Sequence, residues 1–297
     1  MLALGAGAGL ATAVPATASA AEGGGGTSPG QEEVLRRLSD LEREHSARLG
    51  VFARNTVTGR TVLYRAHKRF PICSTAKTIG VAAVLRDLDR DGEFLARRIR
   101  YTEQDTTKSG NAPITGRPEN LANGMTVSEL CAAAIDYSDN AAFNLLLREL
   151  GGPTAITRFC RSIGDRTTRL DRWEPELNTA EPWRVTDTTT PYAIGRTNAR
   201  LTLGDALEPG DRARLTDWML ANTTSGGRFR KGLPADWTLA DKTGTGEYGT
   251  TDDVGIAWTP EGSPVVLAVL STRPEADAAA DEPLVAKTAA LLAGALG

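Results

Sequence analysis

Strand-like segments occur near both ends of the chain, and a long helix-rich middle separates them. Runs of β-branched and apolar residues predict strands at 51–56, 60–65, 238–242, 254–258 and 265–271. Residues 74–220 are mostly helical in pattern and are interrupted by Gly- and Pro-rich turns. We therefore expect an α/β (α+β) fold, in which a five-stranded antiparallel sheet flanked by helices carries an inserted all-α lobe, with a ligand cleft between the lobes.

The predicted catalytic domain covers residues 31–297 and is divided between these two lobes. The sheet lobe is expected to combine residues 31–73 and 214–297, and the helical lobe to cover residues 74–213. A first helix is predicted to begin at Ser28 and Pro29, an N-cap followed by a first-turn proline. Its apolar face consists of Val34, Leu35, Leu38 and Leu41. A second terminal helix is expected over residues 283–296.

Residues 1–21 are apolar and small and end near Ala18-Ser19-Ala20, a pattern typical of signal-peptidase sites. They predict a signal peptide and a secreted protein, and the missing basic n-region predicts a natural start further upstream. A disordered leader is the alternative. The stretch is too short and too rich in Ala and Gly for a membrane anchor. Residues 22–30 are expected to form a flexible linker.

The charge and the cysteine content exclude several classes of function. A net charge of −3 gives no indication of nucleic-acid or membrane binding. Three cysteines (Cys73, Cys131 and Cys160) are too few for a disulfide scaffold. Two histidines (His45 and His67), far from any Cys or carboxylate cluster, do not predict a zinc site. We expect no metal and no organic cofactor.

The first candidate catalytic motif is Ser74-Thr75-Ala76-Lys77, which precedes a helical pattern. This places Ser74 at a helix N-terminus, where free N–H groups favour developing negative charge, and Lys77 one turn later on the same face. An amine beside a hydroxyl can accept its proton and activate it as a nucleophile. The alternative is a capping serine followed by a surface lysine.

The second motif is Ser138-Asp139-Asn140, which follows a helix-like stretch at 127–137. A hydroxyl and an amide two positions apart can relay a proton and hold a substrate amide. Because Ser, Asp and Asn are common helix caps, a polar helix junction is the alternative.

The third motif is Lys242-Thr243-Gly244 at the end of a predicted strand. On an exposed strand, a lysine and a hydroxyl suit a carboxylate-bearing ligand, while Gly244 allows close approach and Thr245 offers its N–H to an oxyanion. A strand edge protected by lysine and glycine is the alternative.

Together the three motifs, in this order, resemble class A serine β-lactamases and penicillin-binding proteins, and the chain is most similar to the actinobacterial type. The resemblance covers residues 31–297, including Gly124–Cys131 and Leu233–Trp237. It implies the β-lactamase fold, with the active site between the lobes.

A fourth element, Glu174-Pro175-Glu176-Leu177-Asn178, lies in a segment that resembles the family's Ω-loop at about 169–187. Arg172 and Asp187 match the ion pair that closes that loop. Glu174 and Asn178 match the pair that positions the deacylating water. This element favours a hydrolase over a D-alanyl-D-alanine carboxypeptidase or transpeptidase, and over a non-catalytic β-lactam sensor, which remain the alternatives.

The resemblance implies a mechanism in which Ser74 attacks the lactam carbonyl and the N–H groups of Ser74 and Thr245 bind the oxyanion. The proton acceptor is either Lys77 or Glu174 acting through a water. Glu174 then activates the deacylating water. Ser138, aided by Lys242, delivers a proton to the departing lactam nitrogen. Asn140 holds the side-chain amide of the substrate. The other substrate-binding residues are Asn178, Thr243 and Gly244.

Several positions differ from the common family pattern. Thr251 stands where many members carry an arginine, and Arg228 occupies the alternative site, so Arg228 is assigned to the substrate carboxylate. Cys131 faces Val81 instead of a partner cysteine. Cys73 precedes the nucleophile, as in carbapenem-hydrolysing members, but Gly246 stands where those members carry the partner cysteine. The sequence therefore does not support carbapenemase activity. The segment at 106–120 is about two residues longer than usual and lacks the aromatic residue that commonly lines the cleft.

The expected partners are small β-lactam substrates. A proteinaceous β-lactamase inhibitor is a further partner that the sequence does not decide, and the family default is a monomer.

Overall fold

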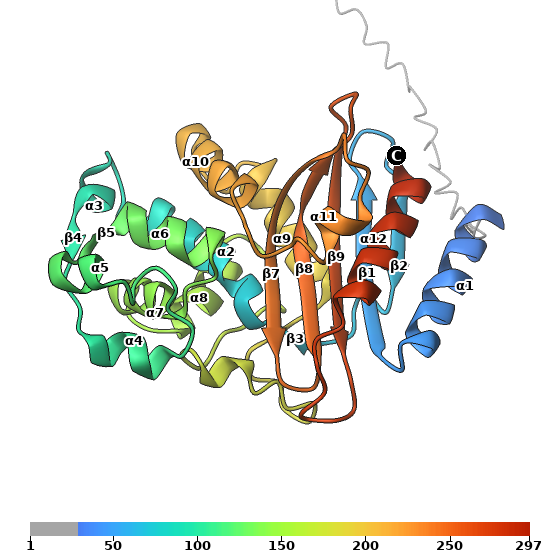
Figure 1. Cartoon of the computed structure of the whole chain (residues 1–297). Helices are drawn as coiled ribbons and strands as arrows, with labels where there is room; N and C mark the ends of the chain where they lie inside the picture. The colour runs from blue at the N-terminus through green and yellow to red at the C-terminus, as the bar shows by residue number, and fades with distance from the viewer. Residues whose placement is uncertain (1–28) are drawn as a thin grey trace, which may run out of the picture.

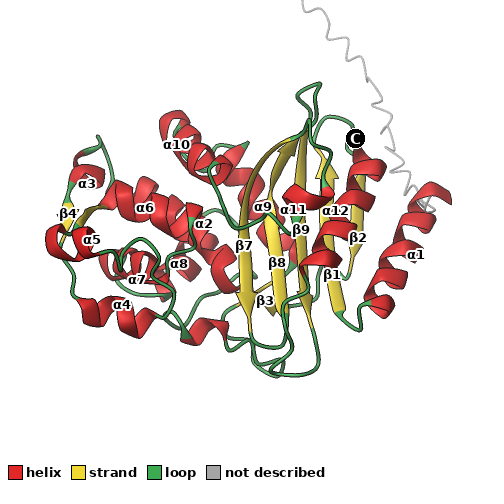
Figure 2. Cartoon of the chain, viewed as in Figure 1, coloured by secondary structure: helices red, strands yellow, loops and turns green. Residues whose placement is uncertain are grey.

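The computed structural model describes residues 29–297, which form a five-stranded antiparallel sheet and a helical lobe beside it (Figures 1 and 2). The sheet order is β2-β1-β9-β8-β7. Its strands are β1 (Arg48–Asn55), β2 (Thr61–Tyr64), β7 (Thr238–Gly246), β8 (Thr250–Trp258) and β9 (Pro264–Thr272). The predicted fold class is confirmed, because the strands of this sheet come from the two ends of the described chain and the helices of the lobe beside it come from the middle.

Alternate residues of the central strands face two different helix layers, as the period of a β-strand requires. On one side, Leu49, Val51 and Ala53 of β1 pack in a core with α1 (Pro29–Glu44) and α12 (Glu282–Leu296). On the other side, Phe52 belongs to the core shared with the helical lobe. Helix α9 (Pro191–Thr202) packs against β9, β8 and β1 on that second side, although the predicted boundary assigns it to the helical lobe.

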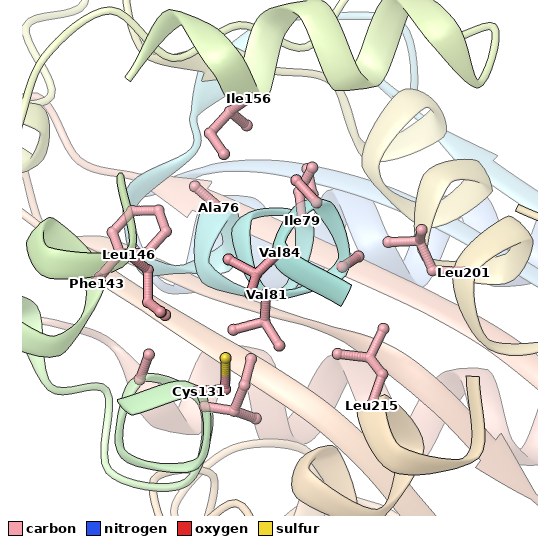
Figure 3. Close-up of a cluster of buried hydrophobic side chains, with 14 of the residues drawn as sticks. Ala76, Ile79, Val81, Val84, Cys131, Phe143, Leu146, Ile156, Leu201 and Leu215 are labelled. Carbon is pink, nitrogen blue, oxygen red and sulfur yellow. The ribbon is translucent and has the colours of Figure 1, made fainter. Parts of the chain in front are cut away.

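The helical lobe is built around α2 (Ala76–Ala83), whose residues are all buried. Figure 3 shows α2 surrounded by apolar side chains from its neighbours, among them Cys131, Phe143, Ile156 and Leu215. The neighbouring helices are α6 (Val127–Asp136), α7 (Asn140–Glu149), α8 (Thr154–Ser162) and α10 (Pro209–Leu220). Because α2 is held on all sides, the residues at its N-terminus have a fixed position.

Shorter elements complete the described chain. The helices are α3 (Glu93–Ala96), α4 (Glu103–Ser109), α5 (Pro118–Asn123) and α11 (Phe229–Gly232), with the single turns η1 (Cys73–Thr75), η2 (Val84–Leu88) and η3 (Glu176–Asn178). The short strand pairs are β3 (Phe70–Pro71) with β6 (Thr188–Thr189), and β4 (Arg98–Ile99) with β5 (Met125–Thr126). Strand β3 is only two residues long, and η1 begins at Cys73, directly before Ser74.

The N-terminal predictions fall mostly outside the described residues. The predicted signal peptide and residues 22–28 of the predicted linker lie there, whereas Pro29 and Gly30 are helical and belong to α1. Within residues 29–297 no helix is both long and apolar enough to cross a membrane.

Candidate active site

Ser74 and Lys77 meet at the start of the helical lobe. Ser74 lies in η1, and Lys77 lies in the first turn of α2. The Nζ of Lys77 donates a hydrogen bond of 2.9 Å to Ser74 Oγ. Lys77 is completely buried and Ser74 is 8% exposed, so the hydroxyl is accessible while the amine is not. The predicted nucleophile and amine are therefore brought together.

The ammonium of Lys77 is also the centre of a larger network. It lies 3.0 Å from Glu174 Oε1, and both side chains are fully buried. It donates to Ser138 O at 2.9 Å, to Ser138 Oγ at 3.2 Å and to Asn140 Oδ1 at 2.6 Å. A buried ammonium is stable only when a carboxylate and further acceptors surround it, and this one has both.

Asp139 holds the Ser138-Asp139-Asn140 junction in place. Its carboxylate accepts hydrogen bonds from the N–H of Ala142, as the N-cap of α7, and from the N–H and hydroxyl of Thr115. Ser138 has a left-handed backbone (φ 55°), which directs the chain toward Lys77. The capping alternative is thus correct for Asp139, and the cap orients the two residues on either side of it.

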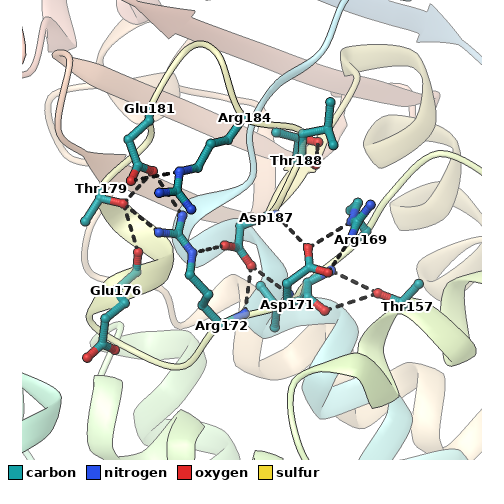
Figure 4. Close-up of polar contacts among 12 residues, drawn as sticks. Thr157, Arg169, Asp171, Arg172, Glu176, Thr179, Glu181, Arg184, Asp187 and Thr188 are labelled. Carbon is teal, nitrogen blue, oxygen red and sulfur yellow. Dashed lines mark hydrogen bonds and ion pairs between the residues drawn. The ribbon is translucent and has the colours of Figure 1, made fainter.

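The Ω-loop is closed by the ion pair that its sequence resemblance implies. Arg172 Nε donates to Asp187 Oδ2 at 2.5 Å, and the other carboxylate oxygen of Asp187 accepts from the N–H groups of Asp171 and Arg172 (Figure 4). Arg172 also contacts Thr179 and Glu181 within the loop. These contacts hold the two ends of the Ω-loop together next to Glu174.

Glu174 is positioned through both its backbone and its side chain. Its N–H donates to Asn144 Oδ1 at 3.0 Å, and its carbonyl accepts from Asn144 Nδ2 at 2.9 Å. Its Oε2 accepts from Asn178 Nδ2 at 2.5 Å. The sequence analysis missed Asn144, although it follows Asn140 by one turn on the same face of α7, and this periodicity could have identified it.

Lys242, Thr243 and Gly244 lie in the middle of β7, and the expected exposed strand is wrong for this stretch. Lys242 is fully buried and Thr243 is 5% exposed, because η1 and α10 pack against the strand. Lys242 Nζ donates to Thr243 O at 3.0 Å. Burial lowers the pKa of Lys242 well below its usual value, and the nearby charge of Lys77 lowers it further. The edge position of β7 is as expected.

Arg228 joins the cleft to β7. Its guanidinium donates to the carbonyls of Gly244 (2.7 Å) and Asp252 (2.8 Å) and to Thr245 Oγ1 (2.6 Å). Its Nε donates to Glu282 at 3.2 Å. The arginine predicted for the carboxylate thus lies beside the predicted Thr245.

These residues surround a cavity of about 260 Å³ between the lobes. Among residues 29–297, Arg228 is the only charged residue in its lining, which suits a ligand with one negative group. The lining also contains Ser74, Asn111, Tyr137, Ser138, Asn140, Asn178, Thr224, Thr243 and Thr245. Lys77, Glu174, Lys242 and Gly244 do not line it and are buried. Asn111, Tyr137 and Thr224 were not predicted, because loop contacts leave no periodic signal.

The comparisons with known proteins agree with this geometry. The sequence model of the Beta-lactamase enzyme family matches residues 33–296. The chain belongs to this family. It is similar to a beta-lactamase of Streptomyces lavendulae (72% identity, 90% of this chain and 88% of that one) and to one of Streptomyces fradiae (65% identity, 100% and 95%). The solved beta-lactamase from Streptomyces albus G superposes with a TM-score of 0.89 at 64% identity, covering 89% of this chain and all of that one. The predicted resemblance to actinobacterial β-lactamases is confirmed.

The cysteines of this family member are all free and buried. Cys131 lies in the same apolar core as Val81, as predicted. A Cβ placed on Gly246 would lie 2.8 Å from Cys73 Sγ, so Gly246 does face Cys73 across the cleft floor. Burial raises the pKa of the Cys73 thiol, and the carboxylates of Asp252 and Glu174 raise it further. No disulfide constrains the cleft.

Within the described residues of this family member, no three His, Cys, Asp or Glu side chains form a group that could hold a metal ion. Thr251, at the position where many members carry arginine, is buried and bonds to Gly249 O at 2.9 Å.

Proposed function

We propose that the protein is a class A serine β-lactamase, which hydrolyses the β-lactam amide bond of penicillins, of cephalosporins or of both through an acyl-enzyme on Ser74. One observation carries the proposal. The ammonium of Lys77 contacts both the Ser74 hydroxyl (2.9 Å) and the Glu174 carboxylate (3.0 Å), so nucleophile and deacylating base share one partner. Asn178 holds the other oxygen of the same carboxylate.

Acylation begins with loss of the Ser74 proton. Lys77 can accept it directly when neutral, or Glu174 can accept it through a water, and the contacts support both routes. The N–H groups of Ser74 and Thr245 bind the oxyanion, Thr245 from the unpaired edge of β7. Loss of one such donor typically lowers the rate about 100- to 1000-fold.

Ser138 then delivers a proton to the departing lactam nitrogen. Its hydroxyl accepts from Lys77 at 3.2 Å, which supplies the proton, and Lys242 assists by its positive charge. Asn140 uses its Oδ1 on Lys77 and one amide hydrogen on Ser109 O, so its second amide hydrogen is available for the carbonyl of the substrate side chain.

The carboxylate of the substrate binds to Arg228 together with the hydroxyls of Thr243 and Thr245. Both threonines line the cavity, and Arg228 already donates to Thr245 Oγ1. Gly244 contributes its backbone, whose carbonyl fixes the guanidinium.

Deacylation distinguishes this proposal from a D-alanyl-D-alanine peptidase and from a sensor, both of which keep the acyl group longer. Glu174 and Asn178 together place a water beside the ester and remove its proton. We also propose that the natural protein is secreted by means of residues 1–21 and acts as a monomer. The mass of the protein recovered from culture medium, and its elution volume, test these two points.

The test is turnover of a chromogenic cephalosporin by the mature protein beside Glu174→Ala and Glu176→Ala. Glu176 is exposed in the same loop and serves as the matched control. We expect many turnovers by the wild type and the control, and about one equivalent of acyl-enzyme on Ser74, seen by mass spectrometry, in Glu174→Ala. A single burst from the wild type would instead identify a penicillin-binding protein.

A further inference from the structure

A second cavity, of about 330 Å³, lies between helix α9 and the loop that leads from α8 into the Ω-loop. It shares no residue with the cavity around Ser74. Its lining includes three arginines, Arg166 from the loop and Arg196 and Arg200 from α9. We call these three residues and the space between them the arginine pocket.

Within residues 29–297, none of the three guanidinium groups forms an ion pair or a hydrogen bond. Arg196 has an aromatic neighbour, since its Cζ lies 5.8 Å from the centroid of the Tyr192 ring. Tyr192, Arg196 and Arg200 follow one another at intervals of four residues, so they lie along one face of α9. Like charges at this spacing repel each other in the absence of a counterion. Arg166 and Arg196 are exposed and Arg200 is partly buried, so water solvates the three charges, and an anion bound between them would offset their repulsion.

The position of Arg200 depends on the loop opposite. Gly164 has a left-handed backbone (φ +82°), and a Cβ placed on it would lie 2.6 Å from Arg200 Nη1. Only glycine adopts this conformation readily and leaves space for the guanidinium. Arg200 of α9 therefore lies beside the loop that carries Arg166. Cations from two separate elements thus line one cavity.

Asp165, the acidic residue in the described lining, forms no ion pair with the three arginines, so the formal charges of the lining are three positive and one negative. The Oδ1 of Asp165 accepts from the N–H groups of Thr167 and Thr168 at 2.8 and 3.0 Å, and its Oδ2 accepts from Thr197 Oγ1 at 2.9 Å. Arg161 donates to the carbonyl of the same residue at 2.5 Å. Asp165 is buried and its carboxylate is used to hold the loop.

We propose that the arginine pocket binds a phosphate group. Guanidinium groups bind phosphate oxygens through paired N–H donors, and three of them facing one cavity match an anion with more than one charge. The concentration of positive charge is local, since the whole chain has a net charge of −3. The phosphate comes either from the free ion or from a phosphate-containing polymer. The site is independent of the proposed hydrolysis, because none of its residues lines the catalytic cavity.

The experiment measures binding of inorganic phosphate, and separately of long-chain polyphosphate, to the mature protein by calorimetry at constant ionic strength. The test variant is Arg166→Gln/Arg196→Gln/Arg200→Gln. The matched control is Arg37→Gln/Arg54→Gln/Arg90→Gln, which removes three exposed arginines and gives the same net charge. Gly164→Ala is a second test variant, because it keeps every arginine, while the added Cβ displaces Arg200 and strains the loop that carries Arg166.

We expect the triple pocket variant to bind the anion at least about 100-fold more weakly and Gly164→Ala about 10-fold more weakly, with the control unchanged. Turnover of the chromogenic cephalosporin should be equal in all variants, which shows that each is folded. Binding of free phosphate would identify the ion as sufficient, and binding of polyphosphate alone would identify the polymer. Equal weakening in the pocket variant and the control, or no binding of either anion, would overturn the proposal.

Discussion

Each wall of the catalytic cleft contains a buried lysine, and the two lysines differ in their polar partners. On the helical wall, Lys77 is surrounded by a carboxylate and four oxygen contacts from Ser74, Ser138 and Asn140. On the sheet wall, Lys242 donates to one carbonyl, that of Thr243, and its pKa is lowered well below the usual value by burial and by Lys77. The difference indicates that Lys77 is compensated by a carboxylate within the fold, whereas Lys242 forms no ion pair with a carboxylate of the described residues.

The strongest test of this comparison is Lys77→Ala. It removes the partner of the Ser74 hydroxyl and leaves the Glu174 carboxylate buried without its cation. We expect kcat/KM to fall at least about 10⁴-fold and the free energy of unfolding to fall by about 3–5 kcal/mol. Urea denaturation and steady-state kinetics measure the two effects.

The double variant Lys77→Ala/Glu174→Gln serves as the control, because a neutral amide needs no cation. It should recover most of the lost stability and none of the activity. Equal stability of the single and double variants would show that the Lys77–Glu174 pair does not stabilise the fold.

The second test is Lys242→Met on the opposite wall. We expect kcat/KM to fall about 100-fold, because a positive charge at the leaving group is lost, while the free energy of unfolding is at least as large as in the wild type. Since the folded-state pKa of Lys242 lies below 10.5, the unfolded chain binds more protons, and wild-type stability rises with pH toward that value. Urea denaturation from about pH 7 to 10 should give a smaller rise in the variant, and an identical rise would contradict the lowered pKa.

A smaller effect is expected from Asn144→Ala, behind the helical wall. The variant loses both hydrogen bonds to the backbone of Glu174 but neither of the carboxylate contacts. We expect deacylation to slow about 10-fold and acylation to change less, because only the base is misplaced. Pre-steady-state kinetics separates the two steps, and an unchanged rate of deacylation would contradict the positioning role of Asn144.

The smallest effect concerns Asp136, the last residue of α6 in the helical lobe. Burial raises the pKa of its carboxyl to about 6, although the charge of Lys242 opposes the shift. The folded protein therefore binds more protons than the unfolded chain, and this contribution to stability is lost as pH rises from about 4 through 6. Because the residue is partly exposed and solvent screens its charge, we expect the loss to be about 1 kcal/mol. Asp136→Asn should remove that part of the pH dependence, and an unchanged profile would contradict the assignment.

The sequence identified most of the site because its chemistry is concentrated in short motifs at fixed helix and strand positions. Ser74 and Lys77 are one turn apart, and Glu174 and Asn178 lie in one loop, so local spacing was sufficient for their contacts. The burial of Lys242 was not predictable, because it depends on η1 and α10, which are distant in sequence. The lining residues Asn111 and Tyr137 were missed for the same reason: tertiary packing places them.

The fold shows the same division between local and non-local information. The strands and terminal helices were found from their periodicity, with bounds that differ by a few residues. The packing of α9 on the sheet was not found, since an amphipathic pattern gives the apolar face of a helix and not its partner.

The ion pair between Arg172 and Asp187 also has a consequence for how the family can diversify. The pair joins the two ends of the segment 172–187. Glu174 lies in the first part of this segment, whereas later residues such as Trp183 (72% exposed) and Val185 (54% exposed) face solvent. Selection can therefore alter the length and composition of the distal part of the segment without moving the base.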